Sequence, residues 1–154
     1  MDILSPAAKD FLEQNKGKRV VFTNGCFDII HRGHVGYLNE AKKQGKLLFI
    51  GLNSDSSVNR LKGNQRPINN ENDRKYILEN LKPVDFVEIF EEDTPYNLIH
   101  EVRPDVLVKG GDWKVADIVG SDIVQSYEGI VKSLPFFEGH STTDIITKIL
   151  NLKS

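Results

Sequence analysis

Two histidines three residues apart, His31 and His34, are the side chains best placed to act on a charged substrate. They follow an apolar stretch that ends in a turn containing Gly25, and Gly33 stands between them. On a helical turn, residues three apart project from one side. Two imidazoles on one side can donate hydrogen bonds to a phosphoryl group as charge builds on its oxygens. The pattern therefore favours a site for the phosphates of a nucleotide.

The turn before these histidines has the composition of an anion-binding turn. Gly25 and the small Cys26 allow the backbone to approach a ligand closely, and the N–H groups that open a following helix attract anions. Two other interpretations stay open: one histidine packs or caps locally, or Asp28 joins His31 and His34 in a metal site. The sequence contains no Gly-Lys-Ser or Gly-Lys-Thr phosphate loop.

The elements that must position this turn are short apolar runs separated by helical patterns. The expected strands are 19–24, 46–53, 85–90, 104–110 and 129–136. The expected helices are 5–17, 33–45, 70–83, 93–104 and 141–152. The first, second and fourth runs are continuous, as in strands buried on both faces of a parallel sheet. The alternation predicts an α/β, Rossmann-like, doubly wound five-stranded parallel sheet with helices on both faces.

In such a sheet the ligand binds at the carboxyl ends of the strands, where the strand order reverses. Polar, glycine-rich or cap-forming residues follow four of the five runs, which is consistent with a site at that edge. Thr94 is the expected cap of the helix that Pro95 opens. Segment 59–72 is expected to be a long irregular loop, and it is polar enough to be functional.

Composition restricts the class of protein. With 154 residues, 39% hydrophobic and 27% charged, the chain is expected to be one globular domain over 1–154. A net charge of −2 argues against a nucleic-acid partner held by a broad basic face. Its start does not resemble a signal peptide, its longest apolar run is too short to span a bilayer, and it has a single cysteine. These features predict a cytoplasmic protein without a membrane segment.

Four segments together resemble one enzyme family. "FTNGCFDIIHRGH", "NSD", "KGGDW" and "EGHSTTDII" are similar, in order and spacing, to the nucleotidyltransferases that carry H-x-G-H and S-T-T signatures, over about residues 17–150. The resemblance implies a Rossmann-like sheet, a nucleoside triphosphate with Mg²⁺, no metal held by side chains, and a homodimer. It further implies ATP and D-glycero-β-D-manno-heptose 1-phosphate as substrates, with ADP-heptose for lipopolysaccharide core synthesis and pyrophosphate as products.

Other functions remain open within and outside this family. A glycerol-3-phosphate cytidylyltransferase or a GTP-using sugar-phosphate transferase is one alternative. The cytidylyl pattern has an arginine shortly before S-T-T, where this chain has Phe136 and Phe137, so that alternative has less support. A nucleotide-binding module without catalysis and a metallohydrolase are alternatives of other classes.

The resemblance also implies roles for individual residues. The expected catalytic residues are His31, His34 and Lys62. The expected nucleotide-binding residues are Thr23, Gly25, Cys26, Phe27, Gly33, Gly110, Gly111, Asp112, Ser141, Thr142 and Thr143. The expected sugar-phosphate-binding residues are Asp28, Asn53, Asp55, Arg66, Arg74, Lys109 and Trp113. Among them, Lys109 is not implied by the resemblance; it is our hypothesis for the cation that replaces the arginine missing before S-T-T. Purely structural roles are the alternatives for three of these residues. Ser141 would be only an N-cap, Arg74 a surface helix residue, and Trp113 a core or dimer residue. The sequence leaves the role of His140 open.

Overall fold

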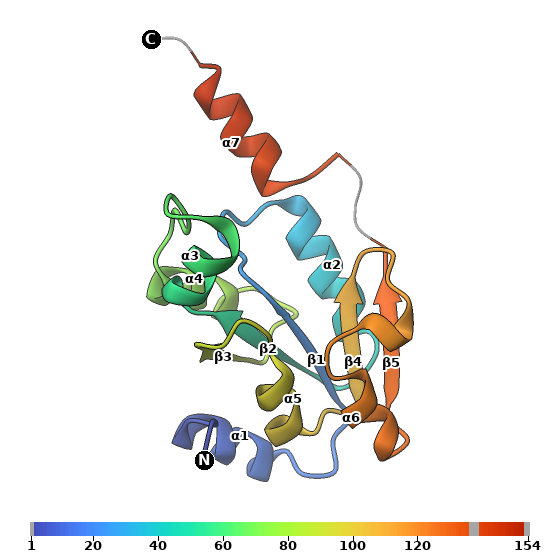
Figure 1. Ribbon diagram of the computed structural model, residues 1–154. Helices are drawn as coiled ribbons and strands as arrows, with labels where there is room; N and C mark the ends of the chain where they lie inside the picture. The colour runs from blue at the N-terminus through green and yellow to red at the C-terminus, as the bar shows by residue number, and fades with distance from the viewer. Residues whose placement is uncertain (1, 136–138, 153–154) are drawn as a thin grey trace.

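The apolar runs of the sequence form a single parallel sheet with helices on both faces (Figure 1). The computed structural model describes residues 2–135 and 139–152. Its strands are β1 Val20–Gly25, β2 Leu47–Asn53, β3 Phe86–Phe90, β4 Val106–Gly110 and β5 Ile130–Leu134. Their order in the sheet is β3-β2-β1-β4-β5, and every pairing is parallel. The predicted fold class is confirmed, and each strand begins one or two residues later than expected.

The helices pack on the two faces of this sheet, except for the last one, which projects from it (Figure 1). They are α1 Pro6–Gln14, α2 Arg32–Lys42, α3 Asp55–Lys62, α4 Glu71–Glu79, α5 Tyr96–Val102, η1 Val115–Asp117, α6 Ser121–Ser126 and α7 Thr142–Leu150. Successive strand side chains point to opposite faces, so Phe22 packs in one core with α1, α5 and α6. Val21 packs in the other core with α2 and α4. Both faces of the sheet are therefore buried, which explains why the sequences of the central strands are continuous apolar runs.

The strand order reverses between β1 and β4, the two neighbours at the centre of the sheet. From β1 the chain winds outward through β2 to β3, and it then returns to place β4 and β5 on the other side. The loops that leave β1 and β4 must diverge there, which opens a crevice at their carboxyl ends.

Two local predictions were wrong, and two short helices were missed. Segment 59–72 is irregular only over 63–70, because α3 runs to Lys62 and α4 begins at Glu71. Ser54 caps α3 through a hydrogen bond from the Ser57 N–H (3.1 Å), and burial of Val58 anchors the helix to the sheet. Helix α5 begins at Tyr96 without a side-chain cap, so Thr94 does not cap it. The short helices η1 and α6 were not predicted.

Helix α7 differs from the other helices in its packing. It projects from the body of the molecule near α2 (Figure 1), and none of its residues is buried. It has an apolar face, yet Ile149 and Leu150 on it are 56% and 77% exposed. Ser141 caps the helix by accepting a hydrogen bond from the Asp144 N–H (3.0 Å). The amino end of α7, rather than its apolar face, is the part that meets the rest of the chain.

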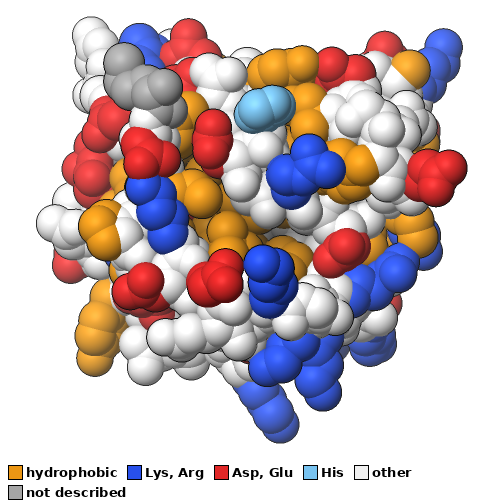
Figure 2. Space-filling model, turned by 90° about the horizontal axis from the view of Figure 1, so that it is seen from below, with side chains coloured by type: hydrophobic (Ala, Val, Ile, Leu, Met, Phe, Trp, Pro, Cys, Tyr) orange, Lys and Arg blue, Asp and Glu red, His pale blue; other side chains and the backbone are white. Residues whose placement is uncertain are grey.

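Figure 2 shows the face at the amino ends of the strands, opposite the crevice. Lys and Arg side chains gather along one side of this face, and Asp and Glu are spread over the rest. Over the described ranges, no helix has both the length and the apolar character needed to cross a membrane.

Candidate active site

A cavity of about 720 Å³ lies at the carboxyl ends of β1 and β4, at the point where the strand order reverses. Its wall is formed by the turn after β1, the start of α2, the end of α3, the end of β4, and the start of α7. The predicted site residues that line it are Gly25, Cys26, Phe27, Asp28, His31, Gly33, His34, Asn53, Lys62, Arg66, Lys109, Gly110, Ser141, Thr142 and Thr143. The structure therefore brings these residues together at the carboxyl edge of the sheet, where the sequence predicts the site.

The two histidines open α2 and hold each other in place. His31 is the N-cap, and its Nδ1 accepts a hydrogen bond from the Gly33 N–H (3.0 Å). The Nδ1 of His34 accepts one from the His31 N–H (3.3 Å). This reciprocal arrangement is a capping box in which both partners are imidazoles. The two ring centroids are 3.9 Å apart.

These hydrogen bonds determine which nitrogen carries the proton. A neutral imidazole whose Nδ1 accepts a hydrogen bond must hold its proton on Nε2. Burial, followed by the charges of His31 and Lys62, lowers the pKa of His34 to about 4. Burial and the charge of His140 lower the pKa of His31. At neutral pH both rings are therefore neutral donors whose Nε2–H groups are free of the capping box.

The turn after β1 is shaped for close approach of a ligand. Phe27 has a left-handed backbone (φ 46°), which is uncommon for a residue with a side chain. This conformation places its ring against Gly25, where an added Cβ would lie 2.9 Å from the ring, and 5.5 Å from the His34 ring between centroids. The Phe27 ring thereby helps to remove His34 from water, which is the main cause of its low pKa.

The start of α7 lies beside the start of α2, which carries the two histidines. The Thr142 hydroxyl donates a hydrogen bond to the Ile29 carbonyl (3.2 Å), which joins α7 to the segment just before α2. Two helix amino ends, each with a positive partial charge, therefore line one cavity. Such an arrangement is suited to an extended polyanion.

Two lysines line the cavity from opposite sides. Lys62 is the last residue of α3, and its charge acts on both Cys26 and His34. Lys109 lies near the end of β4, where burial lowers its pKa, and its Nζ is 5.4 Å from the centroid of the Trp113 ring. The cavity thus has positive charge on the α3 side and on the β4 side.

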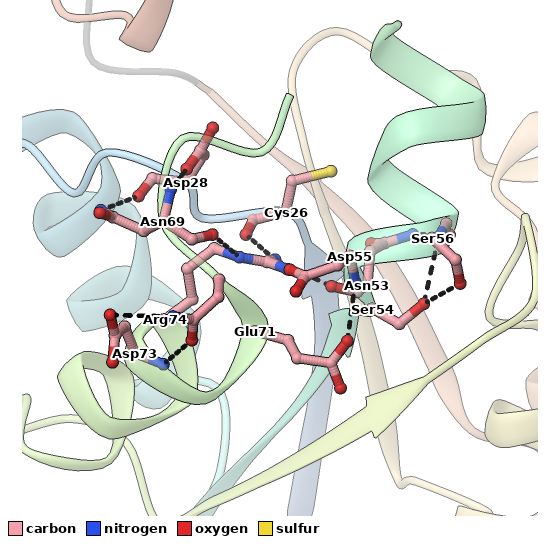
Figure 3. A network of polar contacts seen from close by, with 12 residues as sticks. Cys26, Asp28, Asn53, Ser54, Asp55, Ser56, Asn69, Glu71, Asp73 and Arg74 are labelled. Atoms are coloured by element: carbon pink, nitrogen blue, oxygen red, sulfur yellow. Dashed lines mark hydrogen bonds and ion pairs between the residues drawn. The ribbon is translucent and has the colours of Figure 1, made fainter. Parts of the chain in front are cut away.

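Arg74 has a different place from the one expected (Figure 3). It is neither a surface residue nor part of the cavity wall, because its side chain is fully buried and it does not line the cavity. Its guanidinium donates to the carbonyls of Cys26 (2.7 Å), Asn53 (2.8 Å) and Asn69 (2.9 Å), and to the Asp55 carboxylate (2.8 Å). Arg74 and Asp55 therefore tie together the segments that follow β1 and β2.

Asp28 makes a second tie between the β1 turn and the loop 63–70. Its carboxylate accepts hydrogen bonds from the N–H groups of Ile68 and Asn69 and from Arg66 Nε, all at 2.8 Å in their shortest contacts. Burial opposes the charge, but these donors outweigh it and hold the pKa of Asp28 below its ordinary value. The loop that follows Lys62 is thus fastened to the turn that carries the histidines.

These contacts argue against the metal-site interpretation. The Asp28 carboxylate is engaged by its three donors, so it is not free to join His31 and His34 as a third ligand. In the parts of the chain that the structure describes, no group of three His, Cys, Asp or Glu residues is arranged to hold a metal ion.

Some predicted residues lie beside the cavity without lining it. Besides Arg74, they are Thr23, Asp55, Gly111, Asp112 and Trp113. Thr23 is buried and pairs with the Tyr37 hydroxyl (2.7 Å), so it joins β1 to the middle of α2. Trp113 is 45% exposed, which excludes a core position, and its indole N–H donates to the Gly110 carbonyl (3.1 Å). Phe136 and Phe137 lie outside the described residues.

The cavity also has lining residues that sequence reasoning missed. Most are apolar or aromatic and come from several elements; they are Asn24, Tyr37, Leu61, Asp93, Thr94, Pro95, Leu107, Val108, Ile118, Val119, Gly139 and Asp144, together with His140. No local pattern distinguishes a cavity-lining Leu or Ile from a core one. They form a partly apolar wall of the size and kind that a small organic ligand requires.

Comparisons with known proteins agree with this geometry. A family model described as Cytidylyltransferase-like matches residues 22–148. The chain is 58% identical over 134 residues to the Bifunctional protein HldE of a Nitratiruptor species, which covers 87% of this chain and 28% of the relative. It is 55% identical over 146 residues to the Bifunctional protein HldE of Campylobacter concisus, covering 95% and 30%. The chain thus spans less than a third of the length of these relatives.

Among solved structures, the chain is similar to a lipopolysaccharide core biosynthesis protein from Thermoplasma volcanium. The TM-score is 0.64 at 30% sequence identity, and the match covers 80% of this chain and 100% of that one. A pantoate-beta-alanine ligase from Francisella tularensis matches with a TM-score of 0.56 at 15% identity, over 95% of this chain and 78% of that one. The second likeness concerns the fold alone.

Proposed function

The chain belongs to the cytidylyltransferase-like family of nucleotidyltransferases, and we propose that it joins the adenylyl group of ATP to D-glycero-β-D-manno-heptose 1-phosphate. The products are ADP-heptose and pyrophosphate. Similarity to the HldE proteins and to a lipopolysaccharide core biosynthesis protein supports this reaction. On this proposal the ADP-heptose serves lipopolysaccharide core synthesis, and the reaction takes place in the cytoplasm.

One observation carries the proposal. The neutral rings of His31 and His34, with Nε2–H groups that the capping box leaves free, stand in one cavity with the amino end of α7. Hydrogen-bond donors fixed in advance around the place where charge develops are usually the largest single contribution to catalysis of this kind. On this proposal, the triphosphate of the nucleotide extends between the amino end of α2 and the amino end of α7.

In the proposed reaction, a phosphate oxygen of the sugar 1-phosphate attacks the α-phosphorus of ATP. The bond from the α-phosphorus to the oxygen that bridges to the β-phosphorus breaks, and pyrophosphate leaves with that electron pair. A phosphate monoester is already largely ionised at neutral pH, since its second pKa is about 6. The attack therefore needs no general base, and the chain's task is to orient the two substrates and neutralise their charge.

Each group of the site has a part in this task. His31 and His34 donate hydrogen bonds to the reacting phosphates. Lys62, at the end of α3, neutralises the negative charge around the α-phosphorus. Ser141 and Thr142 bind the β and γ phosphates. Lys109 neutralises charge from the side of β4. Triphosphate enters as its magnesium complex, and no side chain of this chain is required to hold the ion.

Cys26 is not needed as a nucleophile. Burial raises the pKa of its thiol, although Lys62, Arg74 and Arg66 favour the thiolate. A direct displacement at phosphorus has no covalent intermediate on the enzyme. We assign Cys26 the role of a small residue that allows the backbone to approach the nucleotide.

A homodimer is also part of the proposal. The apolar face of α7 supports it, because a nine-residue helix is marginal in water unless a partner covers its apolar side. Size-exclusion chromatography with light scattering would measure the assembly directly, and a monomer at micromolar concentration would contradict it.

The substrate pair is tested by offering heptose 1-phosphate and glycerol 3-phosphate, each with ATP, GTP and CTP, and measuring pyrophosphate. We expect release with ATP and heptose 1-phosphate well above every other pair. Release with CTP and glycerol 3-phosphate would instead favour the cytidylyltransferase alternative. Saturable ATP binding without pyrophosphate from any pair would indicate a nucleotide-binding module.

A further inference from the structure

His140 is the third imidazole of the cavity, and the proposed reaction gives it no role so far. It lies directly before Ser141, the N-cap of α7, and its side chain is exposed to the cavity that it lines. Its ring is nearly parallel to that of His31, with an interplanar angle of 24° and 6.4 Å between centroids. The rings of His34, His31 and His140 therefore form a row that runs from a half-buried position to the surface.

Gly33 is the residue that allows His140 to approach the row. A Cβ added at Gly33 would lie 2.9 Å from the Cβ of His140 and 2.9 Å from Cε1 of His31. Any larger residue at position 33 would therefore push the two imidazoles apart. The segment that leads into α7 can approach the start of α2 because Gly33 has no side chain. The hydrogen bond from the Thr142 hydroxyl to the Ile29 carbonyl stabilises the same contact between the two segments.

His140 differs from the other two histidines in the state of its ring nitrogens. The Nδ1 atoms of His31 and His34 are occupied by the capping box of α2. Within residues 2–135 and 139–152, neither ring nitrogen of His140 has a hydrogen-bond partner. Its donor is therefore available to a ligand in the cavity, and no helix cap is lost when the ring turns.

We propose that His140 is a further substrate-contacting residue, which donates a hydrogen bond to the β or γ phosphate of ATP and to the pyrophosphate that leaves. This inference rests on the proposed function, in which the amino end of α7 receives these two phosphates. His140 immediately precedes that end, so it meets the distal phosphates, whereas the half-buried His34 lies at the far end of the row.

The experiment compares His140→Ala with His100→Ala, a matched control. His100 lies on α5, is 66% exposed in its side chain, and does not line the cavity. Binding of ATP and of AMP, each with magnesium, is measured by calorimetry. A hydrogen bond to a charged group is worth about one factor of ten in affinity or more. We expect His140→Ala to weaken ATP binding about 10-fold and to leave AMP binding unchanged, and His100→Ala to change neither.

The reverse reaction gives a second measurement that a structural role would not reproduce. With ADP-heptose and pyrophosphate as substrates, we expect His140→Ala to raise the KM for pyrophosphate about 10-fold and to leave the KM for ADP-heptose unchanged. His140→Gln keeps a donor and should recover part of the loss. Equal weakening of ATP and AMP, or an unchanged KM for pyrophosphate, would overturn the inference.

The outcome remains distinct from that of the proposed function. Binding of ATP and AMP requires no sugar, so the first measurement reports on His140 even if heptose 1-phosphate is not the acceptor. A wild-type chain that binds ATP more tightly than AMP but forms no ADP-heptose would contradict the reaction. A chain that forms ADP-heptose with an unaffected His140→Ala variant would contradict only the role of His140.

Discussion

At the scale of single residues, the site depends on imidazoles that each have two tasks. In His31 and in His34, Nδ1 accepts a hydrogen bond from a backbone N–H, which completes the cap of α2. The Nε2–H of each ring is left to donate to a ligand. Because the cap selects the tautomer, the donors are fixed before the substrate arrives. Catalytic groups held in this way cost no reorganisation at the moment of reaction.

The first prediction concerns His34→Ala. Loss of one preorganised donor should lower turnover by roughly 10²- to 10³-fold, while ATP affinity changes far less because the other phosphate contacts remain. Steady-state kinetics and calorimetry measure the two quantities. Arg32→Ala is the control, since Arg32 lies on the same helical turn and does not line the cavity. A wild-type rate for His34→Ala would remove this ring from the mechanism.

The second prediction follows from the pKa of about 4 at His34, against an ordinary value of 6.5. Between these values the unfolded ring binds a proton that the folded ring does not. The free energy of unfolding should therefore rise with pH across this window and level off above about pH 6.5. Urea unfolding at several pH values measures the slope, and His34→Gln should make it shallower. Identical slopes for the wild type and His34→Gln would contradict the assigned pKa.

At the scale of elements, the site is assembled by side chains that never touch the cavity. Arg74, on α4, joins the ends of β1 and β2 to the start of α3 and to the loop 63–70. Its planar guanidinium reaches four acceptors in different directions, which a single ammonium cannot do. Helix α3, and with it Lys62, is thereby held at a fixed position relative to the histidine turn.

The third prediction is therefore made for Arg74→Lys. Leaving buried acceptors without donors should lower the free energy of unfolding by about 3 kcal/mol, and turnover should fall at least about 10-fold because Lys62 is no longer held in place. Urea unfolding and kinetics at a temperature where the variant is folded measure both. Arg60→Lys, on the exposed side of α3, is the matched control and should cost little. Equal stabilities of the two variants would refute the role of Arg74.

At the scale of the whole molecule, folding and binding use different parts of the chain. The sheet and the helices α1 to α6 contain the two hydrophobic cores, whereas no residue of α7 is buried. Helix α7 nevertheless brings Ser141 and Thr142 to the cavity. The chain thus completes its site with an element that adds no buried side chain to either core of the monomer.

The fourth prediction tests this separation by ending the chain after residue 138. The free energy of unfolding of the monomer should change by about 1 kcal/mol or less, because none of the described residues in 139–152 is buried. ATP binding should weaken by at least about 10-fold with the loss of the α7 amino end, and AMP binding should be nearly unchanged. Urea unfolding and calorimetry provide the comparison. A truncated chain that no longer folds would show that α7 is part of the core after all.

The sequence by itself determined the elements whose patterns are local. Continuous apolar runs separated by helical periods were enough to predict a parallel five-stranded sheet, and His31, His34 and Ser141 were placed correctly at its carboxyl edge. Local patterns succeed here because backbone hydrogen bonding and side-chain periodicity depend on neighbours along the chain. The start of α3 was missed, because its short polar segment is made helical by a cap and by one buried valine.

Only the tertiary structure decided which distant residues meet. Arg74 reads as an ordinary surface arginine of a polar helix, yet it is fully buried, because carbonyls from three other segments converge on it. His140 is more than a hundred residues from His31 in the sequence. Their rings lie close together because the residue before α7 packs against Gly33. No periodicity encodes such contacts, since they depend on how whole elements pack rather than on the residues beside them.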